Sequence, residues 1–65
     1  MKKLLVSPYK TKVFNGSKGN KFKFVKDQEY EAYAYDGGIE VFLDADNSIH
    51  FTHVKFIDTF KIISK

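Results

Sequence analysis

Two histidines and three aspartates are the residues of this chain that could bind a metal ion. His50 and His53 lie three positions apart, and the nearest carboxylates in sequence belong to Asp44, Asp46 and Asp58. Zinc takes imidazole, thiolate or carboxylate ligands in a tetrahedron. The chain has no cysteine and no third histidine, and the histidine pair crosses an expected junction between a strand and a helix. We therefore expect no metal site and no cofactor.

The sequence also argues against a calcium loop and a catalytic centre. Asp44, Asp46 and Ser48 have the spacing with which a calcium loop begins, but Ile49 and Lys55 stand where that loop has glycine and glutamate. No nucleophile elbow, phosphate loop or thiolate is present. A domain of 65 residues also has no interior room for a substrate pocket. We expect no catalytic residues and no enzyme.

Aromatic and carboxylate side chains share one face of two predicted strands. Successive side chains of a strand point to opposite sides of a sheet, so residues 30 to 35 and 39 to 43 each divide into an apolar set and a mixed set. Tyrosine and phenylalanine are favoured at the centres of protein interfaces. We expect the mixed face to bind a protein, and its candidate residues are Glu31, Tyr33, Tyr35, Glu40, Phe42 and His50. The alternative is that other segments cover these rings as a second layer of core.

Five lysines near the amino terminus form a second candidate site. Lys10, Lys12, Lys18, Lys21 and Lys23 fall along two predicted strands and the glycine-containing loop between them. Such a strip can follow a phosphate backbone, so nonspecific nucleic-acid binding is the alternative function. The chain has no arginine, the residue that makes the commonest specific contact to guanine. Lysines also keep strand edges from aggregating, which would explain the strip without a ligand.

The formal net charge of +3 is unevenly distributed along the chain. Residues 1 to 26 contain eight lysines and no acid, whereas residues 27 to 58 contain eight acids and one lysine, Lys55. Such polarity indicates either a basic surface for nucleic acid or membrane, or an acidic surface for a basic partner. Two halves that neutralise each other locally in the folded chain would give the same pattern.

The segment from residue 22 to 51 positions the candidate face, because its alternating runs are separated by short turn signals. Asp36-Gly37 favours a two-residue hairpin in which both central residues have positive φ. A turn centred there pairs Ala34 with Ile39, Ala32 with Val41 and Tyr30 with Leu43. A turn centred on Gly37-Gly38 keeps the same faces, whereas a three-residue loop would oppose apolar and polar sets. Two registers therefore remain.

The second hairpin and the carboxyl-terminal segment follow by similar reasoning. Asn47 is expected at the left-handed position of a three-residue loop within residues 44 to 48. This register opposes Leu43 to Ile49, Val41 to Phe51 and, on the outer side, Phe42 to His50. Thr52 is expected to cap a helix of one or two turns. Phe56, Ile57 and Phe60 should share one side of it, and residues 60 to 63 should form a closing strand.

Shorter elements are predicted near the amino terminus. Residues 3 to 6 should form an edge strand that ends at Ser7-Pro8. Residues 9 to 14 predict a second strand with Lys10 and Lys12 on one side, and residues 15 to 20 predict a loop. Residues 26 to 28 should form a tight turn. In the strand before it, Phe22 and Phe24 should point inward while Lys21 and Lys23 point outward.

Length and composition allow one small domain, residues 1 to 65. Without cysteine there are no disulfides, so the seven phenylalanines and four tyrosines must supply most of the core. The apolar run Leu4-Leu5-Val6 is too short for a signal peptide, and no run is long enough to span a membrane. The expected location is the cytoplasm.

Three features of the chain suggest a known architecture. They are the pattern of residues 24 to 32 around a diverging turn, the short loop of residues 44 to 48, and a helical turn followed by Phe60-Lys61-Ile62-Ile63. Over about residues 3 to 63 they resemble the Src-homology-3-like small β-barrel. The resemblance implies an all-β fold, a barrel of about five strands with one short helical turn near the carboxyl terminus. The chain has no tryptophan, which the proline-binding groove of peptide-binding members needs, so polyproline is not the expected ligand.

The chain also resembles free-standing barrels found in phages of low-GC Gram-positive bacteria. The resemblance rests on its small size, the absence of arginine and the Tyr-Glu-Ala-Tyr strand before a glycine-rich turn. Such proteins often bind and disable a host replication, transcription or defence factor. We therefore expect this protein to bind one cytoplasmic protein and to modulate or inhibit it. If the target binds DNA, five carboxylates could act as a partial DNA mimic: Glu29, Glu31, Glu40, Asp44 and Asp46. A homodimer through an open edge strand is compatible with either function.

Overall fold

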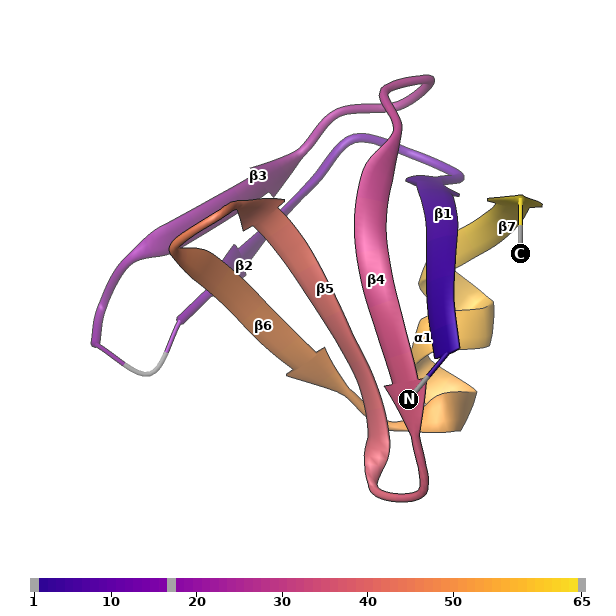
Figure 1. Cartoon of the computed structure of the whole chain (residues 1–65). Coiled ribbons are helices and arrows are strands. Elements are labelled where there is room, and N and C mark those ends of the chain that lie inside the picture. Colours follow the sequence, from indigo (N-terminus) through magenta and orange to yellow (C-terminus); the bar gives the residue numbers. More distant parts are fainter. Residues whose placement is uncertain (1, 17, 65) are drawn as a thin grey trace.

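The computed structural model describes residues 2–16 and 18–64, which form seven strands and one helix (Figure 1). In chain order these are β1 (Lys2–Pro8), β2 (Lys12–Asn15), β3 (Lys21–Phe24), β4 (Tyr30–Tyr35), β5 (Gly38–Asp44), β6 (Asn47–Phe51), α1 (His53–Thr59) and β7 (Phe60–Ser64). Five strands form one sheet in the order β6-β5-β4-β1-β7, and β2 pairs with β3 in a second sheet. The expected all-β class is confirmed. No closed barrel is detected among the described strands, and the Src-homology-3-like architecture stays a prediction.

The first strand lies inside the larger sheet, between β4 and β7. The prediction of an edge strand is wrong, because the last strand of the chain returns beside it and places Phe60 opposite Pro8. On the other side of β1, Leu4 lies opposite Ala32. Pairing on both sides extends β1 to seven residues and buries the side chains of Leu4 and Val6.

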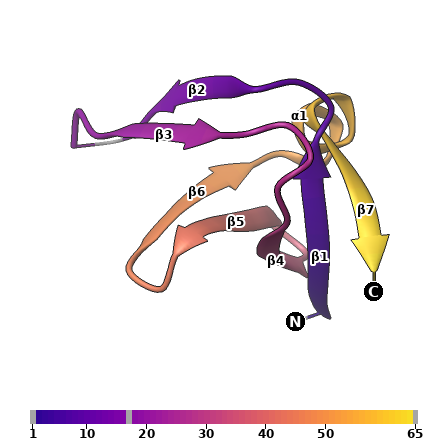
Figure 2. The same ribbon diagram turned by 90° about the horizontal axis from the view of Figure 1, so that it is seen from above.

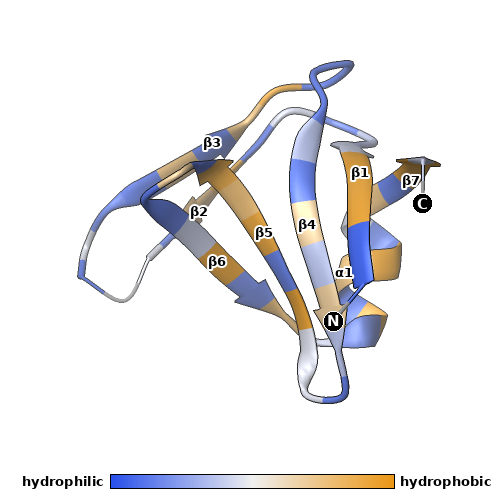
Figure 3. Cartoon of the chain, viewed as in Figure 1, coloured by the Kyte–Doolittle hydropathy of each residue, from blue (hydrophilic) through white to orange (hydrophobic). Residues whose placement is uncertain are grey.

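The hairpin of β4 and β5 has the register that a turn centred on Asp36-Gly37 predicts. Ala34 lies opposite Ile39, and Ala32 opposite Val41. The expected positive φ at both turn residues is wrong, since the positive φ falls one residue later, on Gly38, at 137°. The alternation of apolar and polar residues appears as bands along β5 in Figure 3. This hairpin therefore sends one set of side chains into the core and the other set outward.

The hairpin of β5 and β6 is shifted by two residues from the predicted register. Val41 lies opposite Ile49, and Phe42 opposite Ser48 instead of His50. The cause is a tighter turn: a carboxylate oxygen of Asp44 accepts hydrogen bonds from the Asp46 backbone N–H and the Asn47 side chain, both at 2.9 Å. A bulge between Phe42 and Asp44 absorbs the extra residue, and Asn47 does not take a positive φ.

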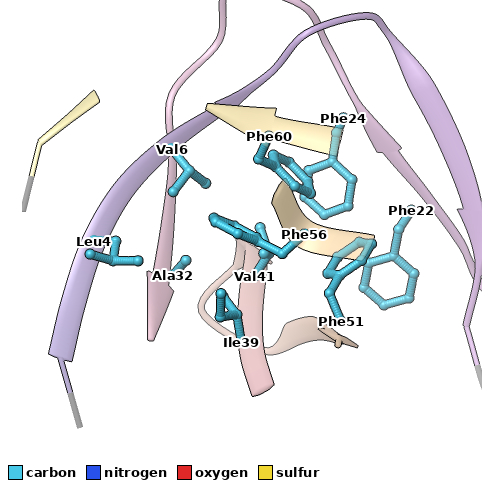
Figure 4. Packing of buried hydrophobic residues seen from close by; sticks show 10 residues of the cluster. All are labelled: Leu4, Val6, Phe22, Phe24, Ala32, Ile39, Val41, Phe51, Phe56 and Phe60. Atoms are coloured by element: carbon cyan, nitrogen blue, oxygen red, sulfur yellow. The ribbon is translucent and has the colours of Figure 1, made fainter. Parts of the chain in front are cut away.

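The core is largely aromatic, as composition predicts. Ten buried apolar residues form it (Figure 4): Leu4, Val6, Phe22, Phe24, Ala32, Ile39, Val41, Phe51, Phe56 and Phe60. Phe60 is at its centre, with its ring centroid 5.4 Å from that of Phe24, 5.3 Å from Phe51 and 5.5 Å from Phe56. Phe14 packs against this cluster, so Phe42 is the one phenylalanine that lies elsewhere.

The two-stranded sheet lies across β5 and β6 and covers one side of them (Figure 2). Phe14 of β2 contacts Phe51 of β6 edge to face, with ring centroids 5.2 Å apart. Phe22 and Phe24 of β3 are buried while Lys21 and Lys23 are exposed, as predicted. Before β3, β2 begins at Lys12, three residues later than expected. The small sheet thus covers the core. We call the core-facing side of each sheet its inner side.

The helix begins as predicted but buries a different set of residues. The Thr52 side chain accepts a hydrogen bond from the Lys55 backbone N–H at 3.3 Å, which caps the first turn. Phe56 is buried, whereas Ile57, expected on the same side, is 65% exposed. Thr59 is buried in its place, because a residue three positions after Phe56 lies nearer to it around the helix than its direct neighbour. No helix in residues 2–16 and 18–64 is long and apolar enough to cross a membrane.

Candidate functional site

The six side chains predicted to bind a protein all lie on one surface of the larger sheet. Ala32, Ile39 and Val41 point into the core, so the residues that alternate with them in β4 and β5 point the other way. We call this opposite surface the outer face. It carries Glu31, Tyr33 and Tyr35 from β4, Glu40 and Phe42 from β5, and His50 from β6, which lies opposite Glu40.

Three aromatic rings on the outer face surround an open hollow of about 520 Å³. Its lining residues are Tyr33, Tyr35, Glu40 and Phe42, and we call it the aromatic pit. The rings of Tyr33 and Phe42 meet edge to face, with centroids 5.6 Å apart and an angle of 84° between their planes. Tyr33 and Phe42 are half-buried, and Tyr35 is exposed. The surface of the hollow is almost entirely carbon, which favours apolar or weakly hydrated groups.

The Glu40 carboxylate is held in place beside the aromatic pit by two hydroxyl donors. Tyr35 Oη donates to Oε1 at 3.3 Å, and Ser48 Oγ donates to Oε2 at 2.9 Å. Partial desolvation raises the pKa of the Tyr35 hydroxyl above its usual value, and the nearby Glu40 charge and their hydrogen bond raise it further. At neutral pH the Tyr35 hydroxyl is protonated and donates to Glu40.

His50 lies on the outer face and contacts the turn between β4 and β5. Its Nε2 lies 2.9 Å from the carbonyl oxygen of Gly37, and its ring centroid is 6.0 Å from that of Tyr35. The ring lies against Gly38, where an added Cβ would overlap it. The structure therefore brings His50 next to the aromatic pit without making it part of the lining.

The first strand adds residues to the outer face that the sequence did not indicate. Lys3 lies opposite Tyr33, and its Nζ is 3.5 Å from Oε2 of Glu31. Leu5 lies opposite Glu31 and is half-buried. Alternation around Leu4 and Val6 was visible in the sequence. The sequence did not show that β1 lies beside β4, so the side chains of Lys3 and Leu5 could not be assigned to this surface.

A second hollow lies on the other side of Phe42 and is acidic. It has a volume of about 350 Å³, and its lining includes the carboxyl-bearing residues Glu29, Glu31 and Asp44. Asp46, the remaining residue of the expected acidic set, lines a different hollow between β6 and the end of the β2–β3 hairpin. Four of the five expected carboxylates thus lie on or beside the outer face, where they surround the aromatic rings.

The five lysines of the alternative site do not share one face. Val13 lies opposite Lys23, whereas Lys12 lies opposite Phe24, so Lys12 starts from the inner side of the small sheet and Lys23 from its outer side. Lys21 is on the same side as Lys23, Lys10 lies in the bend before β2, and Lys18 lies in the turn after it. Of the five lysines, only Lys21 and Lys23 lie side by side on one surface, next to Val13.

Among the described residues, no group of three or more His, Asp or Glu side chains converges to hold a metal ion. His50 lies in β6 and His53 is the first residue of α1. Comparison of the chain with family models, with curated proteins and with solved structures finds no match.

Proposed function

We propose that this protein is a small non-enzymatic binding protein that uses its outer face to bind one protein partner and to modulate or inhibit it. The observation that carries the proposal is the aromatic pit, in which three rings surround a hollow that remains open. Burying such rings against a partner removes apolar surface from water and is the commonest source of strong local binding energy in interfaces.

The arrangement of charges supports a protein partner with a basic surface. Glu40 lines the aromatic pit, and Glu29, Glu31 and Asp44 line the hollow beyond Phe42. Carboxylates around an apolar centre give the polar rim typical of an interface and speed association with a basic partner. The proposed partner is a cytoplasmic host factor of replication, transcription or defence, as the resemblance to phage barrels implies, and the Src-homology-3-like scaffold belongs to the same proposal.

The experiment is capture of a partner from a bacterial lysate with three forms of the immobilised protein. The wild-type protein should retain one protein species, and the double variant Tyr33→Ala/Phe42→Ala should lose it. The matched control, Lys21→Ala/Lys23→Ala, removes two exposed side chains from the other sheet and should retain it. Circular dichroism verifies that all forms are folded. Equal capture by the wild type and the aromatic variant contradicts the proposal.

Nucleic-acid binding is the second candidate, and the outer side of the small sheet is what favours it. There Lys23 lies opposite the exposed side chain of Val13 and Lys21 lies two residues along the same strand, so both ammonium groups can reach phosphates. Labelled duplex and single-stranded DNA should then bind at low salt, and binding should fall steeply towards physiological salt. It should fall further in Lys21→Ala/Lys23→Ala. An absence of binding at low salt removes this candidate and leaves the first.

A further inference from the structure

We propose that the aromatic pit receives the guanidinium group of an arginine side chain on the partner. The inference rests on the proposed function and adds the chemical identity of the group that enters the site. It follows from three properties of the aromatic pit: the three rings that line it, the carbon surface of its walls, and the charges around it.

Three aromatic rings line the hollow, so a cation that enters it has aromatic neighbours. Tyr33 and Phe42 stand nearly perpendicular, at 84°, and Tyr35 forms a further side of the hollow. The face of an aromatic ring carries partial negative charge, so a cation within about 6 Å of the ring centroid is attracted to it. The hollow, about 520 Å³ in volume, has room for one long side chain with its polar end.

The walls favour guanidinium over ammonium. The surface of the aromatic pit is almost entirely carbon, so an ammonium ion entering it would lose water and find only Glu40 as a hydrogen-bond acceptor. A guanidinium is planar and more weakly hydrated, and it stacks on aromatic faces while its edge still donates hydrogen bonds. Arginine therefore fits these walls better than lysine.

The charges around the aromatic pit distinguish a cation from an apolar side chain. Glu40 is part of the lining, and its carboxylate, fixed by Tyr35 and Ser48, has room to accept a further hydrogen bond. Glu31 is the other nearby carboxylate and is bound to Lys3, with both side chains more than half exposed. A partner's cation would gain from the charge of Glu40 at the edge of the aromatic pit, whereas a leucine or isoleucine would gain nothing from either charge.

The test is an NMR titration of the whole protein with N-acetyl-L-arginine amide, following the ring protons of Tyr33, Tyr35 and Phe42. Two matched probes accompany it: the citrulline amide, which has the same shape without charge, and the leucine amide, which is apolar. The arginine probe should shift the ring signals and saturate, with an affinity at least about fivefold higher than that of the citrulline probe. Equal or stronger shifts with the leucine probe overturn the proposal, as does an absence of ring shifts with all three.

Variants assign the effect to the proposed contacts. Phe42→Leu keeps an apolar wall but removes one ring face, and should weaken the arginine probe about two- to fivefold. Glu40→Gln keeps the shape of the carboxylate and should weaken it about fivefold. Lys23→Ala, on the other sheet, should leave it unchanged. Unchanged affinity in both Phe42→Leu and Glu40→Gln would overturn the proposal.

The two proposals fail separately. If the leucine probe prevails while Tyr33→Ala/Phe42→Ala abolishes capture, the outer face binds a protein but its centre accepts an apolar side chain. If the arginine probe binds as expected but capture does not depend on Tyr33 and Phe42, the cation site stands and the proposed function is wrong.

Discussion

Both faces of the larger sheet carry aromatic rings that meet edge to face. On the inner side, Phe60 meets Phe51 and Phe24 edge to face, with centroids 5.3 and 5.4 Å apart. On the outer side, Tyr33 meets Phe42 at 5.6 Å and 84°. Both arrangements are those that the ring quadrupole favours. Contact geometry alone therefore does not separate core from surface in this protein.

What separates the two clusters is coverage. Phe24 of the small sheet and Phe56 of α1 pack against Phe60, which is 2% exposed. The described chain places no comparable layer over Tyr33 and Phe42, and the hollow between them stays open. A chain of 65 residues has few elements with which to cover a sheet, and here they cover one side. The uncovered aromatic side is thus the one available to a partner.

The largest expected effect comes from the centre of the inner cluster. Phe60→Ala should cost about 3–5 kcal/mol, because it removes a buried ring and leaves a cavity. A domain this small is rarely more stable than that, so the variant should be unfolded by circular dichroism at 25 °C. Phe42→Ala is the matched change on the outer face, and it should leave the protein folded and lower the free energy of unfolding by only about 1 kcal/mol. A folded Phe60→Ala, or an unfolded Phe42→Ala, would contradict the division into covered and uncovered faces.

Gly38→Ala should have the next largest effect, and it acts on the outer face through the backbone. Gly38 has a φ of 137°, and an added Cβ would overlap the His50 ring and lie 2.5 Å from the carbonyl oxygen of Phe51. We expect a loss of about 1–3 kcal/mol, measured by urea unfolding. Gly37→Ala is the control, since its φ is not positive and its Cβ would meet only the ring of Tyr35, at 3.0 Å. Equal losses of stability in the two variants would show that backbone strain and overlap at Gly38 are not the cause of the loss.

Sequence reasoning placed the side chains of β4 and β5 on the candidate face because that step needs only the period of a strand. Alternation assigned Tyr33, Tyr35, Glu40 and Phe42 to one side. The turn signals left two registers between their strands, and the observed one is that of a turn centred on Asp36-Gly37. It did not identify the aromatic pit itself. The contact between Tyr33 and Phe42 is diagonal across the hairpin, and the hydrogen bond from Ser48 to Glu40 depends on the third strand. Such contacts follow from strand order and twist, which alternation does not encode.

The errors in the fold have the same origin. A shift of two residues keeps every side chain on its face, so the apolar pattern could not exclude the wrong register between β5 and β6. The Asp44 side chain decided it through bonds to Asp46 and Asn47. Likewise, β1 became an interior strand because β7 pairs with it from the far end of the chain. No local signal around residues 3 to 6 reports that partner.

Ser7→Ala should give a smaller effect of opposite sign. The Ser7 hydroxyl is buried, and among the described residues it has no hydrogen-bond partner. A buried polar group without a partner costs stability, so its removal should raise the free energy of unfolding by about 1 kcal/mol. Thr59→Val serves as the contrast, because the Thr59 hydroxyl is also buried but donates to the Lys55 carbonyl at 2.8 Å, and its loss should destabilise the protein. Destabilisation by Ser7→Ala would indicate that the hydroxyl is satisfied in solution.

The smallest expected effect is a pH dependence at the exposed turn between β5 and β6. The backbone N–H of Asp46, followed by the Asn47 side chain, holds the pKa of the Asp44 carboxyl below its usual value. Because the folded pKa is the lower one, this contribution to stability is present above the unfolded pKa, near 3.8, and is lost as the pH falls through the folded value. Asp44→Asn should therefore show a shallower fall of the urea midpoint between pH 5 and pH 2 than the wild type.

Asp46→Asn is the control for this turn, since Asp46 contributes its backbone N–H and the substitution retains it. Equal acid dependence in the wild type and Asp44→Asn would contradict the role of these bonds.

The loss of the Asp44 hydrogen bonds in acid should also affect the two faces of the larger sheet differently. Without these bonds, β6 can shift by two residues along β5, so that Phe42 no longer lies opposite Ser48 on the outer face. Val41 and Phe51 stay in the core in both registers. Acid should thus perturb the NMR signals of the Phe42 ring before those of Phe51.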